Sequence, residues 1–470
     1  MHKKYEINMT KGALLPELLQ FVLPLMLSSM LQIAFNAADL IVVGRFGRPY
    51  AMAAVGSNGA MINLIVNVLL GLATGGGVLC SRYYGAGRAE RLRSTVSTTL
   101  ITGLIGGIIT GVVGLLLTMP LLRLVGSPEE VLPLAAVYLR IYFCGLPAMA
   151  LYNFSAAALR ALGNTRQPLI YLTIAGILNV FLNLFFVIVV GIDVAGVAIA
   201  TVISQCVSAF LTIRCLITTQ DMEIRKLKFS GHIFRQMMRI GIPAGIQGSL
   251  FSVSNFIIQS SVNSFGAAVI AGNSACVSVE SLLYCPQDAV MQAATTAVSQ
   301  NVGAQEEGRA RSVARWCMLI TVVISGILTA LAIGFRREVL GLYTTDESEL
   351  EAAMIRLTTI GVWYILDGTM SAMSGVNRGL GYSLLPAVVT FLGACVFRIV
   401  WVYTVFASVR TLECLYFSYP ISWTLTTIVH IICYFIIRHR PFRAKLGVAA
   451  AKNHAKAVAE KKLDKPEITQ

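Results

Sequence analysis

Four ionisable side chains lie deep inside long apolar stretches of this 470-residue chain: Asp39, Glu280, Asp367 and Arg398. A charge at bilayer depth costs about 2.5–3.5 kcal/mol even on the mildest scale, so each of these residues needs a partner or a role. A buried carboxylate can take up and release a proton or Na⁺, because burial disfavours its charged form and a nearby cation favours it. These residues therefore indicate ion handling inside a membrane.

Asp39 stands three residues after Asn36 in one apolar stretch, so we expect a helix to turn both side chains to one side. In the functional interpretation, Asp39 takes up and releases a proton or Na⁺. In the alternative interpretation, Asp39 lies near the outer end of its helix and simply reaches water.

Asn179 and Asn183 stand four residues apart and share one face of a later apolar stretch. Amide oxygens are good ligands for hard cations and are cheaper to bury than carboxylates. The alternative is hydrogen bonding between helices in lipid. Asn153 and Thr201 allow the same two interpretations.

Arg398 has about ten apolar residues on either side and cannot easily reach the membrane surface. We expect Arg398 to form an ion pair with Glu280 or Asp367. That pair is either structural, or it is broken or protonated during transport. Asp288 follows two turns after Glu280 and is expected to line the same cavity.

The composition places these residues in a membrane protein. Hydrophobic residues make up 56% of the chain and charged residues 13%, with a mean hydropathy of +0.73. A soluble domain carries roughly a quarter charged residues. The net charge of +14 resides in short loops, which disfavours nucleic-acid binding. The ten cysteines are scattered and form no C-x-x-C pair, so we expect packing roles and no disulfide or thiolate metal site. No cleavable signal peptide is evident.

Twelve apolar stretches are long enough to span a bilayer of ~30 Å, which predicts an all-α membrane protein. Their approximate spans are 14–42, 52–79, 95–119, 133–158, 168–190, 194–218, 236–262, 269–298, 314–335, 351–376, 384–407 and 412–437. Alternate loops are rich in Lys and Arg, so the positive-inside rule predicts a plasma-membrane protein with both termini in the cytoplasm. Residues 438–470 form a basic tail, which is either solvated or attracted to anionic lipid.

The two halves of the chain repeat each other with an offset of about 218 residues. Ser81–Arg91 parallels Ser299–Arg309, and Arg160-Ala161-Leu162-Gly163 parallels Arg378-Gly379-Leu380-Gly381. We therefore expect two pseudo-symmetric six-helix lobes, residues 1–218 and 240–437, joined by a cytoplasmic linker at 219–239. Such a chain is typical of a transporter that moves one half against the other around a central site.

The chain resembles the multidrug and toxic compound extrusion (MATE) family over about residues 10–440. The segments that carry the resemblance occur in order and at matching places. They are Pro24 with Asn36-x-x-Asp39-x-x-x-x-Gly44, Gly85-Ala86-Gly87, Leu159-Arg160-Ala161-Leu162-Gly163-Asn164-Thr165, Gly196-Val197-Ala198-Ile199-Ala200-Thr201, Gln300-Asn301-Val302-Gly303-Ala304 and Arg378-Gly379-Leu380-Gly381.

The resemblance implies two lobes around a V-shaped cavity, and drug efflux driven by inward H⁺ or Na⁺. In DinF-like members the cation site matches Asp39, Asn153, Asn179, Asn183 and Thr201 here. This chain departs at Asn183, where many relatives have a second Asp. Because one acid is lost, we expect a single protonatable Asp39 and H⁺ coupling, with Na⁺ at Asp39, Asn179 and Asn183 as the alternative.

The second half also resembles NorM-like members, in which an Asp stands eleven residues before an Arg-Gly pair. Asp367 stands in that position before Arg378-Gly379. Those members carry a helix 7 Glu, which is absent here, and Glu280 one helix later is its conjectured substitute. The chain therefore mixes features of both branches.

We expect a monomeric antiporter that exports amphipathic, often cationic, organic compounds, with membrane lipids around it and no cofactor. A flippase for a lipid-linked precursor is the alternative. Anionic headgroups would require several arginines in the cavity, whereas only Arg398 stands at clear membrane depth. A membrane-embedded enzyme is disfavoured, because no HExxH or paired Ser/Lys or Asp/Asp motif and no soluble catalytic domain is found.

Overall fold

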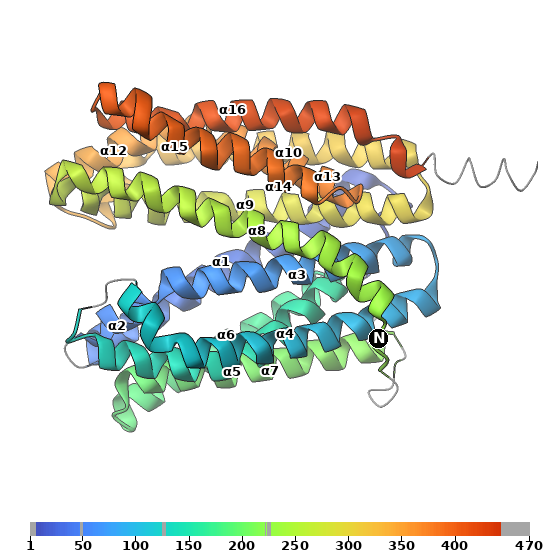
Figure 1. Cartoon of the computed structure of the whole chain (residues 1–470), viewed down its shortest axis with the longest axis horizontal. Helices are drawn as coiled ribbons and strands as arrows, with labels where there is room; N and C mark the ends of the chain where they lie inside the picture. Colours follow the sequence, from blue (N-terminus) through green and yellow to red (C-terminus); the bar gives the residue numbers. More distant parts are fainter. Residues whose placement is uncertain (1–5, 48–49, 125–127, 221, 223–226, 443–470) are drawn as a thin grey trace, which may run out of the picture.

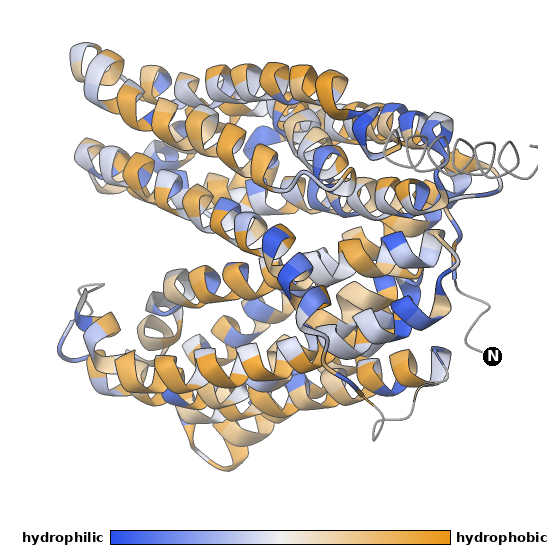
Figure 2. Cartoon of the chain, turned by 45° about the vertical axis from the view of Figure 1, so that its right-hand side comes forward, coloured by the Kyte–Doolittle hydropathy of each residue, from blue (hydrophilic) through white to orange (hydrophobic). Residues whose placement is uncertain are grey.

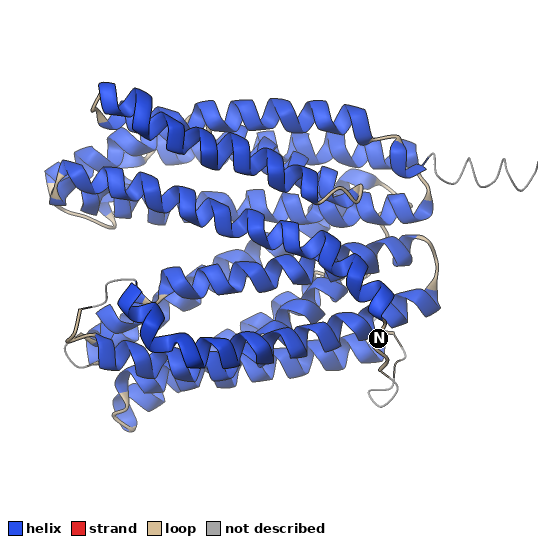
Figure 3. Cartoon of the chain, in the orientation of Figure 1, coloured by secondary structure: helices blue, strands red, loops and turns tan. Residues whose placement is uncertain are grey.

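The computed structural model describes residues 6–47, 50–124, 128–220, 222 and 227–442. Within these residues the chain consists of helices joined by loops and contains no strand (Figure 3). The basic tail predicted at residues 438–470 lies outside the described residues beyond Phe442. Hydrophobic residues cover most of the length of the helices, and hydrophilic residues gather at helix ends (Figure 2).

The first half of the chain contains seven α-helices. They are α1 (Leu14–Phe46), α2 (Ala51–Ser57), α3 (Gly59–Gly85), α4 (Ala89–Leu124), α5 (Leu132–Ala161), α6 (Arg166–Leu184), which continues as the π-helix η2 (Phe185–Val189), and α7 (Asp193–Thr219). Since α2 and α3 form one apolar segment, Ala51–Gly85, the first half crosses the membrane in six segments.

The second half repeats this plan with more interruptions. Its helices are α8 (Gly231–Val262), η4 (Asn263–Phe265), α9 (Ala267–Ala304), α10 (Glu307–Gly334), α11 (Arg336–Gly341), α12 (Glu347–Gly361), α13 (Tyr364–Gly379), α14 (Leu384–Thr390), η5 (Phe391–Val396), α15 (Phe397–Trp401), η6 (Val402–Phe406) and α16 (Leu412–Ile437). α12 with α13 makes one crossing, and α14 to η6 makes another. With the first half, these give twelve segments in the described chain.

Ten of the twelve segments are long and apolar enough to span a membrane by length and composition alone, over the described residues. The two others are α8, whose second half is rich in Ser, and the α12–α13 pair, which is interrupted at Val362 and Trp363. The polarity of these segments has a structural reason, because both contribute side chains to the cavities described below.

The connector between the halves is shorter than the linker predicted at residues 219–239. α7 extends to Thr219, and α8 already begins at Gly231. Ser230 caps α8, because its side chain accepts a hydrogen bond from the backbone N–H of Ile233. The first turns of α8 are polar, so the apolar pattern placed the start of this helix too late.

The two halves lie one above the other, with the first half below and the second above in Figure 1. They meet closely at the end of the molecule that carries the N-terminus, which we call the terminus end. α3 lies against α8 there without side chains between them, because a Cβ at Gly71 would clash with the backbone of Gly245. Likewise, a Cβ at Gly75 would clash with the carbonyl oxygen of Met237.

The repeated segments Ser81–Arg91 and Ser299–Arg309 face each other across this interface. A Cβ at Gly85 would clash with the carbonyl oxygen of Gln300, and a Cβ at Gly303 would clash with that of Arg82. The two contacts are equivalent by the repeat, since Gly85 corresponds to Gly303 and Arg82 to Gln300. The glycines therefore form a reciprocal backbone contact around a pseudo-two-fold axis.

The N-terminal segment crosses the terminus end and contacts both halves. The N–H of Ile7 donates to the carbonyl of Gly163 in the first half at 3.3 Å. Met9 is fully buried, and its N–H donates to Oε1 of Gln300 in the second half at 3.0 Å. Its carbonyl accepts from Arg309 Nε at 2.7 Å. These contacts hold the two halves together at this end.

The close backbone contact predicts the effect of adding one methyl group. Gly303→Ala should lower the thermal stability of the purified protein, because the new Cβ must displace α3, at a cost of about 1–3 kcal/mol. Gly85→Ala should have a similar effect, since it occupies the equivalent position. Thermal unfolding in detergent measures both.

Gly308→Ala is the matched control, because a Cβ there meets nothing within 4 Å. Alanine is the better helix former, so this control should be neutral or slightly stabilising. Equal stability of Gly303→Ala and Gly308→Ala would show that the two halves do not meet as closely as described.

Candidate functional site

The first half contains a buried polar cluster formed by Asp39, Asn179, Asn183 and Thr201, which we call the Asp39 cluster. Asp39 on α1 is 8% exposed, and its Oδ1 accepts a hydrogen bond from Nδ2 of Asn183 on α6. The same Nδ2 lies 3.3 Å from Oδ1 of Asn179 one turn earlier. Nδ2 of Asn179 donates to Oγ1 of Thr201 on α7 at 3.3 Å. Three helices of one half therefore converge on a single carboxylate.

The Asp39 cluster contains one hydrogen-bond acceptor that has no donor among the described residues. Asn183 is fully buried, and its Oδ1 has no hydrogen-bond partner within the described structure. A buried polar atom without a partner is costly and needs an explanation. A proton or cation on Asp39 would supply the missing partner. The described residues contain no group of three or more His, Cys, Asp or Glu that could hold a metal ion.

Two residues predicted for this site lie outside the cluster. Asn36 on α1 is exposed whereas Asp39 is buried, and no hydrogen bond joins the two side chains among the described residues. Asn153 on α5 donates from Nδ2 to the carbonyl of Met149 at 2.9 Å and faces a central cavity instead.

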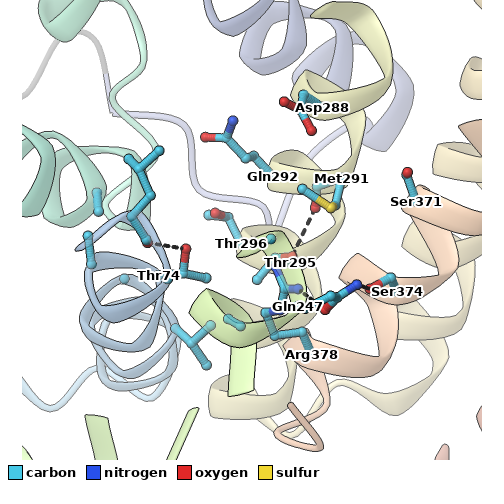
Figure 4. Close-up of a pocket in the computed structure, with 18 of the residues that line it drawn as sticks. Thr74, Gln247, Asp288, Met291, Gln292, Thr295, Thr296, Ser371, Ser374 and Arg378 are labelled. Carbon is cyan, nitrogen blue, oxygen red and sulfur yellow. Dashed lines mark hydrogen bonds between the residues drawn. The ribbon is translucent and has the colours of Figure 1, made fainter. Parts of the chain in front are cut away.

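This central cavity lies between the two halves and has a volume of about 330 Å³. Figure 4 shows the polar side chains that line it. The first half contributes Thr74, Asn153 and Arg160, and the second contributes Gln247, Asp288 and Arg378. Since both halves form its wall, a movement of one half against the other would reshape it.

Two arginines at repeat-related positions line the central cavity. Arg378 at the end of α13 is 6% exposed, and its Nη2 donates to Oε1 of Gln247 at 2.8 Å. Arg160 at the end of α5 donates from Nη1 to Oε1 of Gln292 at 3.1 Å. The expectation that only Arg398 is an arginine of the interior is therefore wrong. Both helices continue past their apolar stretches and carry these arginines inward.

A second cavity of about 250 Å³ lies within the second half and adjoins the first. Asp367 and Arg398 line it, and Asp288, Phe251 and Ser371 belong to the walls of both cavities. The two cavities are therefore neighbours that share part of their walls.

Arg398 is 2% exposed and rests on aromatic rings. Its guanidinium lies 4.0 Å from the ring centre of Tyr419 and 5.8 Å from that of Trp423. Its Nε donates to Oγ of Ser422 at 3.0 Å, and its Nη2 has no partner within the described chain. Arg398 and Asp367 face the same cavity, yet no ion pair within 4.0 Å joins them among the described residues.

The predicted pairing of Arg398 with Glu280 is wrong, because Glu280 has another partner. Arg356 on α12 donates to Glu280 on α9 from Nε at 2.8 Å and from Nη2 at 2.7 Å. Its Nη1 donates to Oδ1 of Asn273, which also accepts from the hydroxyl of Tyr416. Glu280 lines neither cavity, in contrast to the expectation that it belongs to a substrate cavity.

Arg356 was missed although it stands inside the predicted span 351–376. It lies near the polar start of that span, where a loop arginine is also expected. The available signal was its position in a span, combined with a buried acid in the same half that needed a partner.

Removing Arg356 should destabilise the protein strongly. Arg356→Met leaves Glu280 buried without its cation, which costs about 3–5 kcal/mol, whereas removal of both charges is often mild. We therefore expect a large drop in thermal stability for Arg356→Met and partial recovery in Arg356→Met with Glu280→Gln. Thermal unfolding in detergent measures both.

Arg337→Met is the control, because Arg337 pairs with Glu347 at 2.6 Å but both side chains are largely exposed. An exposed pair contributes about 0–1 kcal/mol. If the double variant is no more stable than Arg356→Met alone, the bidentate pair is not the reason for the loss.

The chain matches a family and known folds over most of its length. The MatE family model matches residues 24–185 and 243–404, one stretch in each half. The probable multidrug resistance protein YoeA of Bacillus subtilis (strain 168) is 30% identical over 384 residues, which cover 79% of this chain and 82% of that protein.

Two solved structures share the fold. One is a MOP superfamily transporter from Pyrococcus furiosus, described as having a binding pocket of reverse polarity; its TM-score is 0.86 at 21% identity, covering 93% of this chain and 98% of that one. The other is an outward-facing multidrug resistance MATE family transporter, with a TM-score of 0.84 at 22% identity, covering 94% and 98%. The predicted fold of twelve transmembrane helices in two lobes is thus confirmed, and the chain belongs to the multidrug and toxic compound extrusion (MATE) family of membrane transporters.

Proposed function

We propose that the chain is a secondary active antiporter of the plasma membrane that exports amphipathic organic compounds in exchange for H⁺. The observation that carries the proposal is a polar cavity walled by both halves, together with a separate buried carboxylate cluster in one half. The similarity to a probable multidrug resistance protein supports export of drug-like compounds. The basic loops at the terminus end support a cytoplasmic location of both termini.

α1 provides a physical link between the two places. Phe21 lines the central cavity, and Asp39 lies further along the same helix. Between them Pro24 removes a backbone donor from α1, which makes the helix easier to bend there. A change at Asp39 can therefore bend α1 at a point that lies next to the cavity wall.

The Asp39 cluster offers a simple way to respond to a proton. When Asp39 is ionised, it accepts from the amide N–H of Asn183, as described above. When Asp39 is protonated it becomes a donor, and a rotated Asn183 amide can present its Oδ1 as the acceptor. The two protonation states thus favour two arrangements of α1 against α6. A single carboxylate among amides supports H⁺ over Na⁺, because hard cations favour sites rich in anionic oxygen.

Transport in reconstituted vesicles tests this proposal. We expect efflux of a fluorescent substrate from wild-type vesicles to follow an imposed pH gradient at constant Na⁺. Asp39→Asn should lower coupled efflux about tenfold or more while leaving folding intact, since a proton transfer group of this kind contributes at least that factor. Asn36→Ala is the control on the same helix, and it should transport normally because Asn36 lies outside the cluster.

Wild-type efflux that follows a Na⁺ gradient and ignores the pH gradient would contradict H⁺ coupling. Efflux by Asp39→Asn at the wild-type rate would show that the Asp39 cluster does not couple transport to the proton gradient.

A flippase for a lipid-linked precursor is the second candidate. The sequence argument against it was the lack of cavity arginines, and Arg160 and Arg378 remove that argument. Anionic headgroups would find cationic partners there. Translocation of a fluorescent lipid by the reconstituted protein, without any effect of the soluble substrate, would favour this candidate.

A further inference from the structure

We propose that the cavity binds a zwitterionic amphipathic molecule, with its anionic group on Arg160 and Arg378 and its cationic group toward Asp288 and Asp367. This inference rests on the proposed export function and specifies its substrate class. It starts from two guanidinium groups that have no carboxylate oxygen within 4.0 Å in the described part of the chain.

Neither Arg160 nor Arg378 forms an ion pair within 4.0 Å in the described part of the chain. Arg378 is more than nine-tenths buried, and its Nε has no hydrogen-bond partner. The Nε of Arg160 is also buried and without a partner. The neutral amides Gln247 and Gln292 each take one N–H of these arginines, and a guanidinium carries five.

A buried cation without an anion costs free energy. We therefore expect an anionic ligand to bind these arginines. The planar fork of Arg matches carboxylate and phosphate groups, which accept two parallel hydrogen bonds. Both arginines line the same cavity and come from equivalent positions of the two halves. An anionic ligand there would contact both halves at once.

The carboxylates extend from the central cavity into the second one. Asp288 belongs to the walls of both cavities, and Asp367 lines only the second one. Asp288 is exposed to the cavity space and accepts no hydrogen bond in the described structure (Figure 4). The central cavity therefore contains two guanidinium groups and one carboxylate, and the second cavity contains two carboxylates and one guanidinium.

Arg398 does not remove this difference in charge between the two cavities. It rests on the ring of Tyr419 and donates to Ser422, so part of its charge is already accommodated by the protein. The aromatic rings of Phe251 and Tyr284 add apolar surface between the charged ends. A molecule with an acid at one end, a base at the other and a flat apolar body fits this order of groups.

A pair of dyes that differ in one group tests the proposal. Rhodamine 110 carries a free carboxylate, and rhodamine 123 is its methyl ester. Binding of each dye to the purified protein in detergent is measured by fluorescence polarisation, which requires no gradient and no transport. Arg378→Gln and Arg160→Gln should each weaken binding of rhodamine 110 about tenfold, as loss of a charge-assisted hydrogen bond predicts. Binding of rhodamine 123 should change less than about twofold.

Control variants distinguish binding from folding. Arg88→Gln removes an exposed arginine between α3 and α4 and should leave both dyes unaffected. Arg378→Lys keeps the charge and should retain part of the affinity for rhodamine 110. If Arg378→Gln fails to fold, Arg160→Gln alone decides, because its side chain is less buried.

Competition identifies the source of the zwitterion. Displacement of rhodamine 110 by a soluble short-chain phosphatidylethanolamine assigns the site to a lipid headgroup, and resistance to displacement assigns it to a free organic zwitterion. The proposal is overturned if the wild-type protein does not bind rhodamine 110, or if the arginine variants lose both dyes equally. Failure of vesicle transport with normal dye selectivity would count against the export function and not against the site.

Discussion

The contact of two backbones at Gly85 and Gly303 is the constraint on which the rest of this structure depends. Each glycine lies against a carbonyl oxygen of the opposite half, with no room for a side chain. The halves therefore approach closely at the terminus end, where the N-terminal segment also binds both of them. The two halves diverge away from this end (Figure 1), and the central cavity lies between them.

The buried charges of the second half serve two different purposes. Glu280 and Arg356 satisfy each other through two hydrogen bonds and take no part in a cavity wall. Such a pair fixes the packing of α9 against α12. By contrast, Asp288, Asp367 and Arg378 face the cavities with few protein partners. No ion pair within 4.0 Å engages them in the described part of the chain, which leaves these groups available to a ligand.

Much of the fold could be predicted from the sequence, because a bilayer imposes a minimum length on each apolar stretch and the repeat fixes how the halves correspond. Helical spacing and the family resemblance also predicted three partners of Asp39 in the cluster, namely Asn179, Asn183 and Thr201. Asn36 was predicted for the site from the same kind of spacing, but its side chain is exposed whereas Asp39 is buried. The spacing of residues along the sequence predicts which side chains share a face of a helix, but it does not predict what that face contacts.

The choice of partners in the second half depended on packing that no local pattern encodes. Glu280 has two guanidinium candidates in its own half, and only the placement of α12 against α9 selects Arg356 over Arg398. Arg160 and Arg378 follow directly after the predicted spans 133–158 and 351–376, so the apolar pattern did not include them. Their helices continue to Ala161 and Gly379, and both arginines line the central cavity between the halves.

The proposed mechanism requires the two ends of the molecule to change in opposite directions when Asp39 becomes neutral. Distances between spin labels measured by electron resonance test this directly, with one pair at Arg88 and Glu306 on the terminus end and one at Glu129 and Glu338 on the opposite end; all four positions are exposed. On lowering the pH, we predict that the first distance lengthens while the second shortens, and that Asp39→Asn shows the low-pH distances at every pH. Two distances that stay fixed, or that change in the same direction, would contradict the account.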